Sequence, residues 1–379
     1  MKKLISIVMV FIMIFAVVAC AGDPTPAAEP AAPAVDDTPA ETATDEGAEP
    51  AAPANGDEGL ATSGEILRVA VQSQQVSWII QYILDRGWDV EAGIPVELVV
   101  FPGGAPINEA MAAGEWDVAI TGGAAIFGIA NFYGRLLGHH MDGSGNNSIM
   151  ARIGDEAFNV QGYNPAYPDV FGCPETVRGR TVLTVAGTSA HYAMLGWLRI
   201  LGLTSADVEM VSTDFAGIIA AFRAGEGDFA SMTDNRVLLG AADEGWAEVA
   251  TLRGMNLPLL ESVVSTSSAY YNRFNDLVAF MELVYRANDE LLQSEELQVE
   301  YLKKWFEANA MDTDLDFYQI IPARPLVSSD MARAMDLHDF ILAYAEFFIA
   351  IEMLEPDRYE VIRANVATDV LDAALANLR

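Results

Sequence analysis

The sequence predicts an α/β protein with two similar lobes and a helical C-terminal region. Three observations lead to this prediction: strands alternate with helices from residue 65, the same order of elements returns after residue 180, and only helical periodicity follows residue 272. Alternating strands and helices are typical of a parallel sheet covered by helices. The 379 residues, 52% of them hydrophobic, suffice for two separate cores.

Strands are predicted from apolar runs that contain many β-branched residues, and helices are predicted from apolar residues at helical spacing. Strands are expected at residues 66–71, 94–101, 117–121, 181–185, 208–211, 229–232 and 249–252. Helices are expected at residues 76–86, 106–113, from 122–123 to about 133, 190–201, 216–224, from about 236, and at 277–291, 296–309 and 332–353.

Two segments are similar in sequence as well as in order. Ala113–Ala119 reads AGEWDVA and Ala224–Ala230 reads AGEGDFA, 111 positions later. The alternative is a common turn that arose twice by chance.

We expect residues 65–150 and 265–379 to form lobe 1 and residues 151–264 to form lobe 2. Two crossings between lobes would make a hinge that can close around a ligand.

The N-terminus indicates export. Lys2 and Lys3 precede the apolar run Leu4–Val18, which is too short for a usual membrane span of about 20 residues. Ala19 and Cys20 follow the run, and the segment resembles a bacterial lipoprotein signal, which implies removal of residues 1–19 and a lipid on Cys20. Residues 20–64 form an acidic, Ala- and Pro-rich segment, which is expected to be a disordered tether. The net charge of −33 argues against a nucleic-acid partner.

Gly179–Leu203 reads as a strand, a tight loop and a helix. Gly187, Thr188 and Ser189 then lie at the helix start, where unpaired backbone N–H groups and the helix dipole favour an anion. The alternative is an ordinary capped helix with nothing bound. His191, one turn into the helix, either donates to a ligand or packs at the lobe surface.

The segment Val177–Tyr192 resembles the lobe-2 opening of ABC-importer solute-binding lipoproteins of the nitrate, sulfonate and taurine group. Weaker matches are Phe101–Gly104, Ala113–Asp117 and Ala224–Asp228. The resemblance implies a type II periplasmic-binding-protein fold, with a solute bound in the cleft between two lobes. It also implies a permease and an ATPase as partners, a location on the extracytoplasmic face of the cell membrane, and no enzymatic activity. We expect a monomer.

In open parallel sheets, ligands bind beyond the carboxyl ends of the strands. The candidate ligand-binding residues at these ends are Gln72, Ser73, Gln75, Gly103, Gly104, Thr121, Gly122, Gly187, Thr188, Ser189, His191, Asp214, Asp234 and Asn235. A small sulfonate, taurine, nitrate or a related anion, held by backbone N–H groups without an arginine, is the first expectation. Asp142, Asp214 and Asp234 would instead suit an amino-bearing solute, and a heterocyclic, thiamine-precursor-like solute is a further alternative.

Other chemistry has weaker signals. His139, His140 and Asp142 could suggest a metal, but adjacent residues of an extended segment point apart, so we expect no metal. A loop at the cleft mouth that brings Asp142, Asn146 or Asn147 near the ligand is expected instead. No phosphate-loop or dinucleotide motif calls for a cofactor. Cys173 with His191 as base would make an enzyme, and a sensor or adhesin that needs no importer is the third class.

Overall fold

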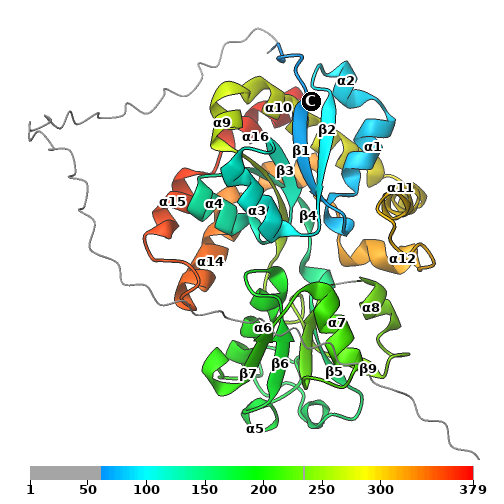
Figure 1. Cartoon of the computed structure of the whole chain (residues 1–379), viewed down its shortest axis with the longest axis vertical. Helices are drawn as coiled ribbons and strands as arrows, with labels where there is room; N and C mark the ends of the chain where they lie inside the picture. The colour runs from blue at the N-terminus through cyan, green and yellow to red at the C-terminus, as the bar shows by residue number, and fades with distance from the viewer. Residues whose placement is uncertain (1–60, 234, 379) are drawn as a thin grey trace, which may run out of the picture. The chain divides into compact units, whose positions relative to one another are not determined.

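The computed structural model describes residues 61–233 and 235–378, in which two five-stranded sheets form (Figure 1). The first sheet has the order β2-β1-β3-β10-β4 and the second has the order β7-β6-β8-β5-β9. The first contains β1 (Leu67–Gln72), β2 (Val96–Phe101), β3 (Val118–Thr121), β4 (Arg135–Asp142) and β10 (Leu260–Ser265). The second contains β5 (Ser148–Arg152), β6 (Thr181–Thr184), β7 (Glu209–Ser212), β8 (Phe229–Met232) and β9 (Trp246–Thr251).

Each sheet is mixed, whereas the sequence predicted parallel sheets. In the first sheet β10 runs antiparallel to β3 and β4, and in the second β5 runs antiparallel to β8 and β9. Neither reversed strand was predicted, nor was β4, where polar residues suggested a loop. His139 and His140 are nevertheless buried within β4. The α/β class with two lobes is confirmed.

The chain crosses between the sheets twice, from β4 to β5 and from β9 to β10. The predicted boundaries at 150/151 and 264/265 fall inside β5 and β10. The reason is that each reversed strand pairs along its whole length with the sheet that the chain is entering. The full extent of the two domains stays a prediction.

Helices connect and cover the strands. They are α1 (Ile79–Asp85), α2 (Trp88–Glu91), α3 (Gly104–Ala113), α4 (Ala125–Phe132), α5 (Pro174–Val177), α6 (Ser189–Ile200), α7 (Phe215–Arg223), α8 (Asn235–Gly240), α9 (Ser267–Asn272), α10 (Phe274–Leu291), α11 (Glu295–Ala308), α12 (Phe317–Ile320), α13 (Ser329–Ala334), α14 (Leu337–Ala350), α15 (Arg358–Ala364) and α16 (Thr368–Asn377). Short 3₁₀ turns are η1 (Gln75–Ser77), η2 (Ser144–Asn146), η3 (Glu156–Asn159), η4 (Ser205–Asp207) and η5 (Ile321–Ala323).

Several C-terminal helices pack on the first sheet or on its helices. Helices α10 and α16 pack on each other and on β4, while α15 packs on α4 (Figure 1). The predicted helix 332–353 is divided into α13 and α14, because Met335 takes an extended backbone and Asp336 caps α14. Fully buried tryptophans mark the core, among them Trp116 in lobe 1 and Trp197 in lobe 2. No helix of the described part is both long and apolar enough to cross a membrane.

The sequence repeat has a structural counterpart at the start of β3 and of β8. The Asp117 carboxylate accepts hydrogen bonds from the backbone N–H of Arg68 (2.9 Å) and from the Arg68 guanidinium (2.8 Å). In lobe 2 the Asp228 carboxylate accepts from the backbone N–H of Thr181 (2.9 Å) and from the Arg180 guanidinium (2.9 Å). The aspartates therefore join β1 to β3 in lobe 1 and β6 to β8 in lobe 2, which supports the interpretation of the repeat as two similar lobes.

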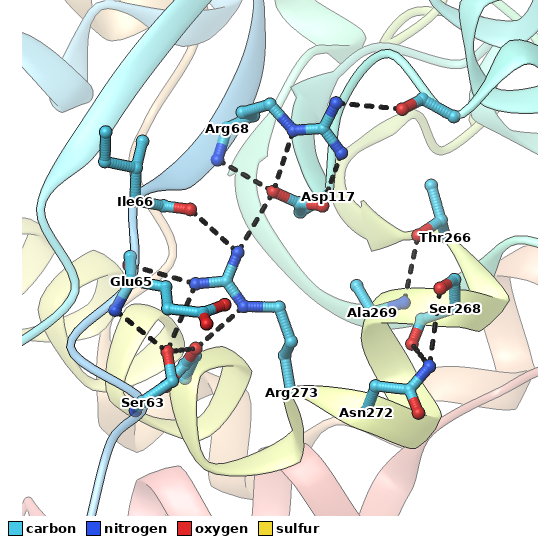
Figure 2. Close-up of polar contacts among 12 residues, drawn as sticks. Ser63, Glu65, Ile66, Arg68, Asp117, Thr266, Ser268, Ala269, Asn272 and Arg273 are labelled. Atoms are coloured by element: carbon cyan, nitrogen blue, oxygen red, sulfur yellow. Dashed lines mark hydrogen bonds and ion pairs between the residues drawn. The ribbon is translucent and has the colours of Figure 1, made fainter.

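Lobe 1 adds a second arginine to this arrangement. Figure 2 shows Asp117 between Arg68 and Arg273, whose Nη1 lies 3.1 Å from the Asp117 carboxylate. Arg273 also binds Asp276 (2.8 Å) and the backbone carbonyls of Glu65 and Ile66. Burial alone would raise the pKa of Asp117, but the hydrogen bonds from Arg68 and the charge of Arg273 hold it below its usual value. The network joins the start of the described chain to α10.

Candidate functional site

A pocket lies where loops and helix starts from both sheets meet. We call it the cleft pocket; its cavity volume is about 40 Å³. It is lined by Gln72, Gln74, Val76, Gly104, Gly122, Gly123, Ala124, Thr188, Ser189, Phe215, Thr233, Glu261 and Arg324. Loops after β1, β3, β6 and β8 contribute to this lining, so the pocket lies where an open α/β sheet is expected to bind a ligand.

Hydrogen bonds connect the parts of the first lobe that line the pocket. The Gln72 side chain donates to the Thr121 hydroxyl (2.9 Å), and the Gln72 backbone N–H donates to the Ser77 hydroxyl (3.0 Å). The indole N–H of Trp305, on α11, donates to the carbonyl oxygens of Ser73 and Gln74 (3.1 and 2.9 Å). Helix α11 therefore fixes a loop that lies more than 200 positions earlier in the chain.

The second lobe contributes the start of α6. Gly187 has φ +69°, a conformation that glycine adopts at little cost, and Thr188 is the extended N-cap residue. The first backbone N–H groups of a helix have no intrahelical partner, and here Thr188 and Ser189 line the cleft pocket. This part of the pocket is therefore suited to a negatively charged group.

An ion pair that the sequence analysis missed lies in the cleft pocket. The Arg324 Nη1 atom donates to the Glu261 Oε1 atom at 3.1 Å, and the two side chains are only 8% and 3% exposed. Arg324 follows η5, and Glu261 lies on β10. Burial raises the pKa of Glu261, and Asp142 adds to this effect, while Arg324 opposes it. The sequence analysis expected an anion site without an arginine. The lining of the cleft pocket differs, because it includes Arg324.

Several buried polar atoms around this pair have no hydrogen-bond partner within the described residues. They include Glu261 Oε2, Arg324 Nε, Asn146 Oδ1 and the Tyr344 hydroxyl. Buried polar groups are normally paired, and removing one from water without a partner costs about 1–3 kcal/mol. The unpartnered atoms of Glu261 and Arg324 leave hydrogen-bonding capacity for a polar group in the cleft pocket.

A second cavity of about 30 Å³ adjoins the first and shares Gln74, Phe215, Thr233 and Arg324 with it. Its other lining residues are Gln75, Asn146, Phe306 and Met311. The Asn146 side-chain amide donates to the Thr233 carbonyl (2.8 Å), so this residue joins η2 to the end of β8. The combined space has apolar walls beside its charged pair, which suits a small solute with an apolar part.

The fourteen predicted residues divide into three groups. Those that line the cleft pocket are Gln72, Gly104, Gly122, Thr188 and Ser189, and Gln75 lines the adjoining cavity. Those outside both linings are Ser73, Gly103, Thr121, Gly187, His191 and Asp214. Asp234 lies outside the described residues, and only the backbone of Asn235, at the start of α8, is described. The predicted ligand contacts themselves stay a proposal.

Asp214 and Asp142 have local structural roles. The Asp214 carboxylate caps α7 by accepting from the Gly217 backbone N–H, and the Asp142 carboxylate accepts from the backbone and hydroxyl of Ser144. Neither residue lines the pocket. The carboxylate that does line the pocket is that of Glu261.

The two adjacent histidines belong to β4. Burial lowers the pKa of each to about 3, so both rings are neutral near neutral pH. His139 lies 3.2 Å from the Ser262 hydroxyl, and no group of three or more potential metal ligands occurs in the part of the chain that is described. The cleft-mouth loop is therefore limited to the residues after Asp142, of which Asn146 lines a cavity.

Cys173 and His191 are not brought together. The Cys173 thiol lies 3.7 Å from the Thr176 hydroxyl, and His191 Nδ1 accepts from the Gly187 backbone N–H (3.3 Å). Burial lowers the pKa of His191. The ring therefore supports the loop before α6, and these contacts give no nucleophile–base pair.

The comparisons with known proteins agree with the fold. No family model matches the chain. A protein of Brachyspira hyodysenteriae, named an ABC transporter periplasmic binding protein, is 27% identical over 320 residues, which cover 84% of this chain and 92% of the relative. The chain is therefore similar over most of its length to a periplasmic binding protein of an ABC transporter.

Solved structures share the architecture at low sequence identity. The aliphatic sulphonate-binding protein SsuA of Escherichia coli is 16% identical with a TM-score of 0.62, covering 80% of this chain and 92% of that one. The nitrate-binding protein NrtA of Synechocystis PCC 6803 is 11% identical with a TM-score of 0.66, covering 84% and 90%. These likenesses show the type II periplasmic-binding-protein fold.

Gly123 offers a test of the pocket. A Cβ atom there would lie 2.5 Å from the Tyr344 hydroxyl oxygen, and that ring is held by stacking on Phe340 and by an edge contact with Tyr192. We expect Gly123→Ala to lower the free energy of unfolding by about 1–3 kcal/mol and to weaken solute binding. Gly103→Ala is the control, because its Cβ meets nothing within 4 Å and its backbone is extended. Urea denaturation and calorimetry would compare them; equal behaviour of both variants would contradict the packing argument.

Proposed function

We propose that the protein captures a small oxyanion-bearing solute, such as a sulfonate, taurine, nitrate or a related anion, and closes its lobes around it. The closed form then delivers the solute to the permease and ATPase of its importer, while a lipid on Cys20 holds the protein at the membrane. The observation that carries the proposal is the cleft pocket, in which Arg324 and the start of α6 meet. Both favour a negative charge.

The nitrate- and sulphonate-binding proteins of the same fold support this ligand class. An alkanesulfonate-binding protein of Xanthomonas axonopodis, 19% identical with a TM-score of 0.60 and covering 79% of this chain and 97% of that one, was solved with bound MOPS. An amino-bearing solute is the second candidate, because the Glu261 carboxylate lines the same pocket.

The test is a thermal-shift screen of the full chain against sulfonates, nitrate, bicarbonate, amino acids and pyrimidines. A solute at about 100 times its dissociation constant adds roughly 2.7 kcal/mol to the free energy of unfolding. Stabilisation by a small oxyanion supports the proposal, and stabilisation only by cationic or neutral solutes would overturn it. Mass spectrometry of membrane-extracted protein tests the lipid on Cys20, since an unmodified mass would refute it.

Ser189 allows the backbone contribution to be measured. Proline is accepted at the first helical position and removes the N–H there, whereas alanine keeps the N–H and removes only the hydroxyl. We expect Ser189→Pro to weaken oxyanion binding about 10-fold or more, the effect of losing one hydrogen bond to a charged group, and Ser189→Ala to have a smaller effect. Titration calorimetry measures both. Wild-type affinity in Ser189→Pro would exclude this N–H as a ligand contact.

A further inference from the structure

We propose that the cleft pocket selects a zwitterionic solute, whose anionic group binds Arg324 and the start of α6 and whose protonated amine binds Glu261. This inference rests on the proposed function and narrows its ligand class. It excludes nitrate and simple alkanesulfonates as the preferred solutes. It also assigns to Glu261 the role of a specificity-determining residue.

The first argument is the unused hydrogen-bonding capacity of Glu261. Its side chain is 3% exposed and lines the cleft pocket, and Arg324 occupies only its Oε1 atom. Its Oε2 atom has no partner within the described residues. That atom lies against the backbone of Gly122, because a Cβ there would be 2.8 Å from it, and Gly122 lines the same pocket. An ionised carboxylate only accepts hydrogen bonds, so the missing group is a donor.

The second argument is charge balance. Arg324 and Glu261 form a pair with no net charge, and both side chains are almost completely buried. A monoanion beside this pair is compensated only by the partial positive charge of the α6 start, so much of its negative charge stays unbalanced out of water, which is unfavourable. A zwitterion supplies an acceptor to Arg324 and a donor to Glu261, and the pocket stays neutral.

The neighbours of Glu261 fit the same arrangement. The charged and titratable groups that act on it are Arg324, Asp142 and Tyr344. Asp142 already accepts two hydrogen bonds from Ser144, so it adds negative potential without competing for the donor. Asn146 Oδ1 and the Tyr344 hydroxyl are also buried and unpartnered in the described part. Since Arg324 and Glu261 touch, the two charged groups of the solute must be close together.

Pairs of similarly shaped solutes isolate the amine. Taurine and 1-propanesulfonate differ by an ammonium in place of a methyl group, as do β-alanine and butyrate. In the pair that binds more tightly, we expect calorimetry on the full chain at pH 7.5 to show at least about 30-fold tighter binding of the zwitterion than of the methyl compound. The methyl compound would leave the buried Glu261 carboxylate without a charged partner. Equal or tighter binding of the methyl compound overturns this inference and leaves the proposed function intact. No binding of any of the four also overturns this inference, and the proposed function is then decided by the thermal-shift screen with nitrate, bicarbonate and other sulfonates.

The pH dependence separates the two modes of binding. Burial raises the pKa of Glu261, and the amine needs the ionised carboxylate. The affinity for taurine should therefore fall as the pH is lowered from 8 to 5. A simple anion would instead bind more tightly at low pH, when Glu261 is protonated. A taurine affinity that rises on acidification would refute the assignment.

A variant gives an independent result. Glu261→Gln removes the negative charge, so it should weaken taurine binding at least about 30-fold and strengthen 1-propanesulfonate binding. Glu244→Gln, at an exposed pair with Arg223, is the matched control. An unchanged ratio of the two affinities in Glu261→Gln overturns the inference. If this variant does not fold, the solute pairs on the native protein still decide the question.

Discussion

Replacement of Arg324 by glutamine is expected to abolish solute binding, with a loss of affinity of at least about 100-fold. Such a loss follows because the guanidinium is the only cation that lines the cleft pocket in the described part of the chain, and a charged partner of a buried anion contributes about 2–5 kcal/mol. The substitution should also lower the free energy of unfolding by about 3–5 kcal/mol, because Glu261 keeps a buried charge without its partner. Calorimetry and urea denaturation measure the two effects.

The two effects of the Arg324 substitution can be separated. The double variant Arg324→Gln/Glu261→Gln leaves no buried charge, so it should recover most of the stability but none of the binding. Arg223→Gln is the matched control, because its side chain is 53% exposed and pairs only on the surface of lobe 2. Wild-type affinity in the folded double variant would exclude Arg324 from the binding site.

Replacement of Asp117 by asparagine is expected to be the most destabilising change outside the pocket. Asp117 accepts hydrogen bonds from Arg68 and Arg273 at the point where β1, β3 and α10 meet (Figure 2). The Asp117 side chain is 13% exposed. We therefore expect the free energy of unfolding to fall by about 2–4 kcal/mol, between the values for a surface ion pair and a buried one. Urea denaturation at pH 7 measures it. The exposed Asp330→Asn, where the side chain is 95% exposed and pairs with Arg333, is the control.

The Asp117 contribution should depend on pH in a defined direction. The pKa of this carboxyl is lowered in the folded state, so its stabilisation is fully present above the unfolded value of about 3.9. It is lost as the pH falls through the lower folded value. The difference in unfolding free energy between wild type and Asp117→Asn should therefore be constant from pH 7 to 5 and narrow below about pH 4. A difference that widens in acid would contradict this role.

Much of the fold could be predicted because its signals are local. The apolar runs of β1, β3, β6 and β8 and the glycine-containing loop before α6 carry their own periodicity and turn residues. The strands that were missed lack such signals. β4 contains His139, His140 and Asp142, and its burial depends on α10 and on residues 325–327, which cover that edge of the sheet. The residues next to β4 in the sequence give no sign that these distant segments bury it.

The candidate site was predicted only where it consists of loops next to strands. Gln72, Gly122 and Ser189 follow predicted strands, whereas Glu261 and Arg324 lie in a missed strand and after a short 3₁₀ turn. A usable signal did exist. Arg324 is an isolated cation within the apolar stretch Ile320–Val327, in a chain with 21 basic residues and 54 acidic ones. A single charged residue in an apolar stretch indicates a side chain that is buried beside a residue of opposite charge.

The sequence by itself determined the α/β class, the two similar lobes and the helix start that lines the pocket. These properties depend on periodicity, capping and repeated turns over a few residues. Only the tertiary structure decided the reversed strands, the assignment of β5 and β10 to their sheets, and the Arg324–Glu261 pair. The partners of that pair lie 63 positions apart, and their contact depends on how the chain returns to the first sheet after crossing into the second. A buried charge is stable only beside its partner, and that proximity is a property of the folded chain.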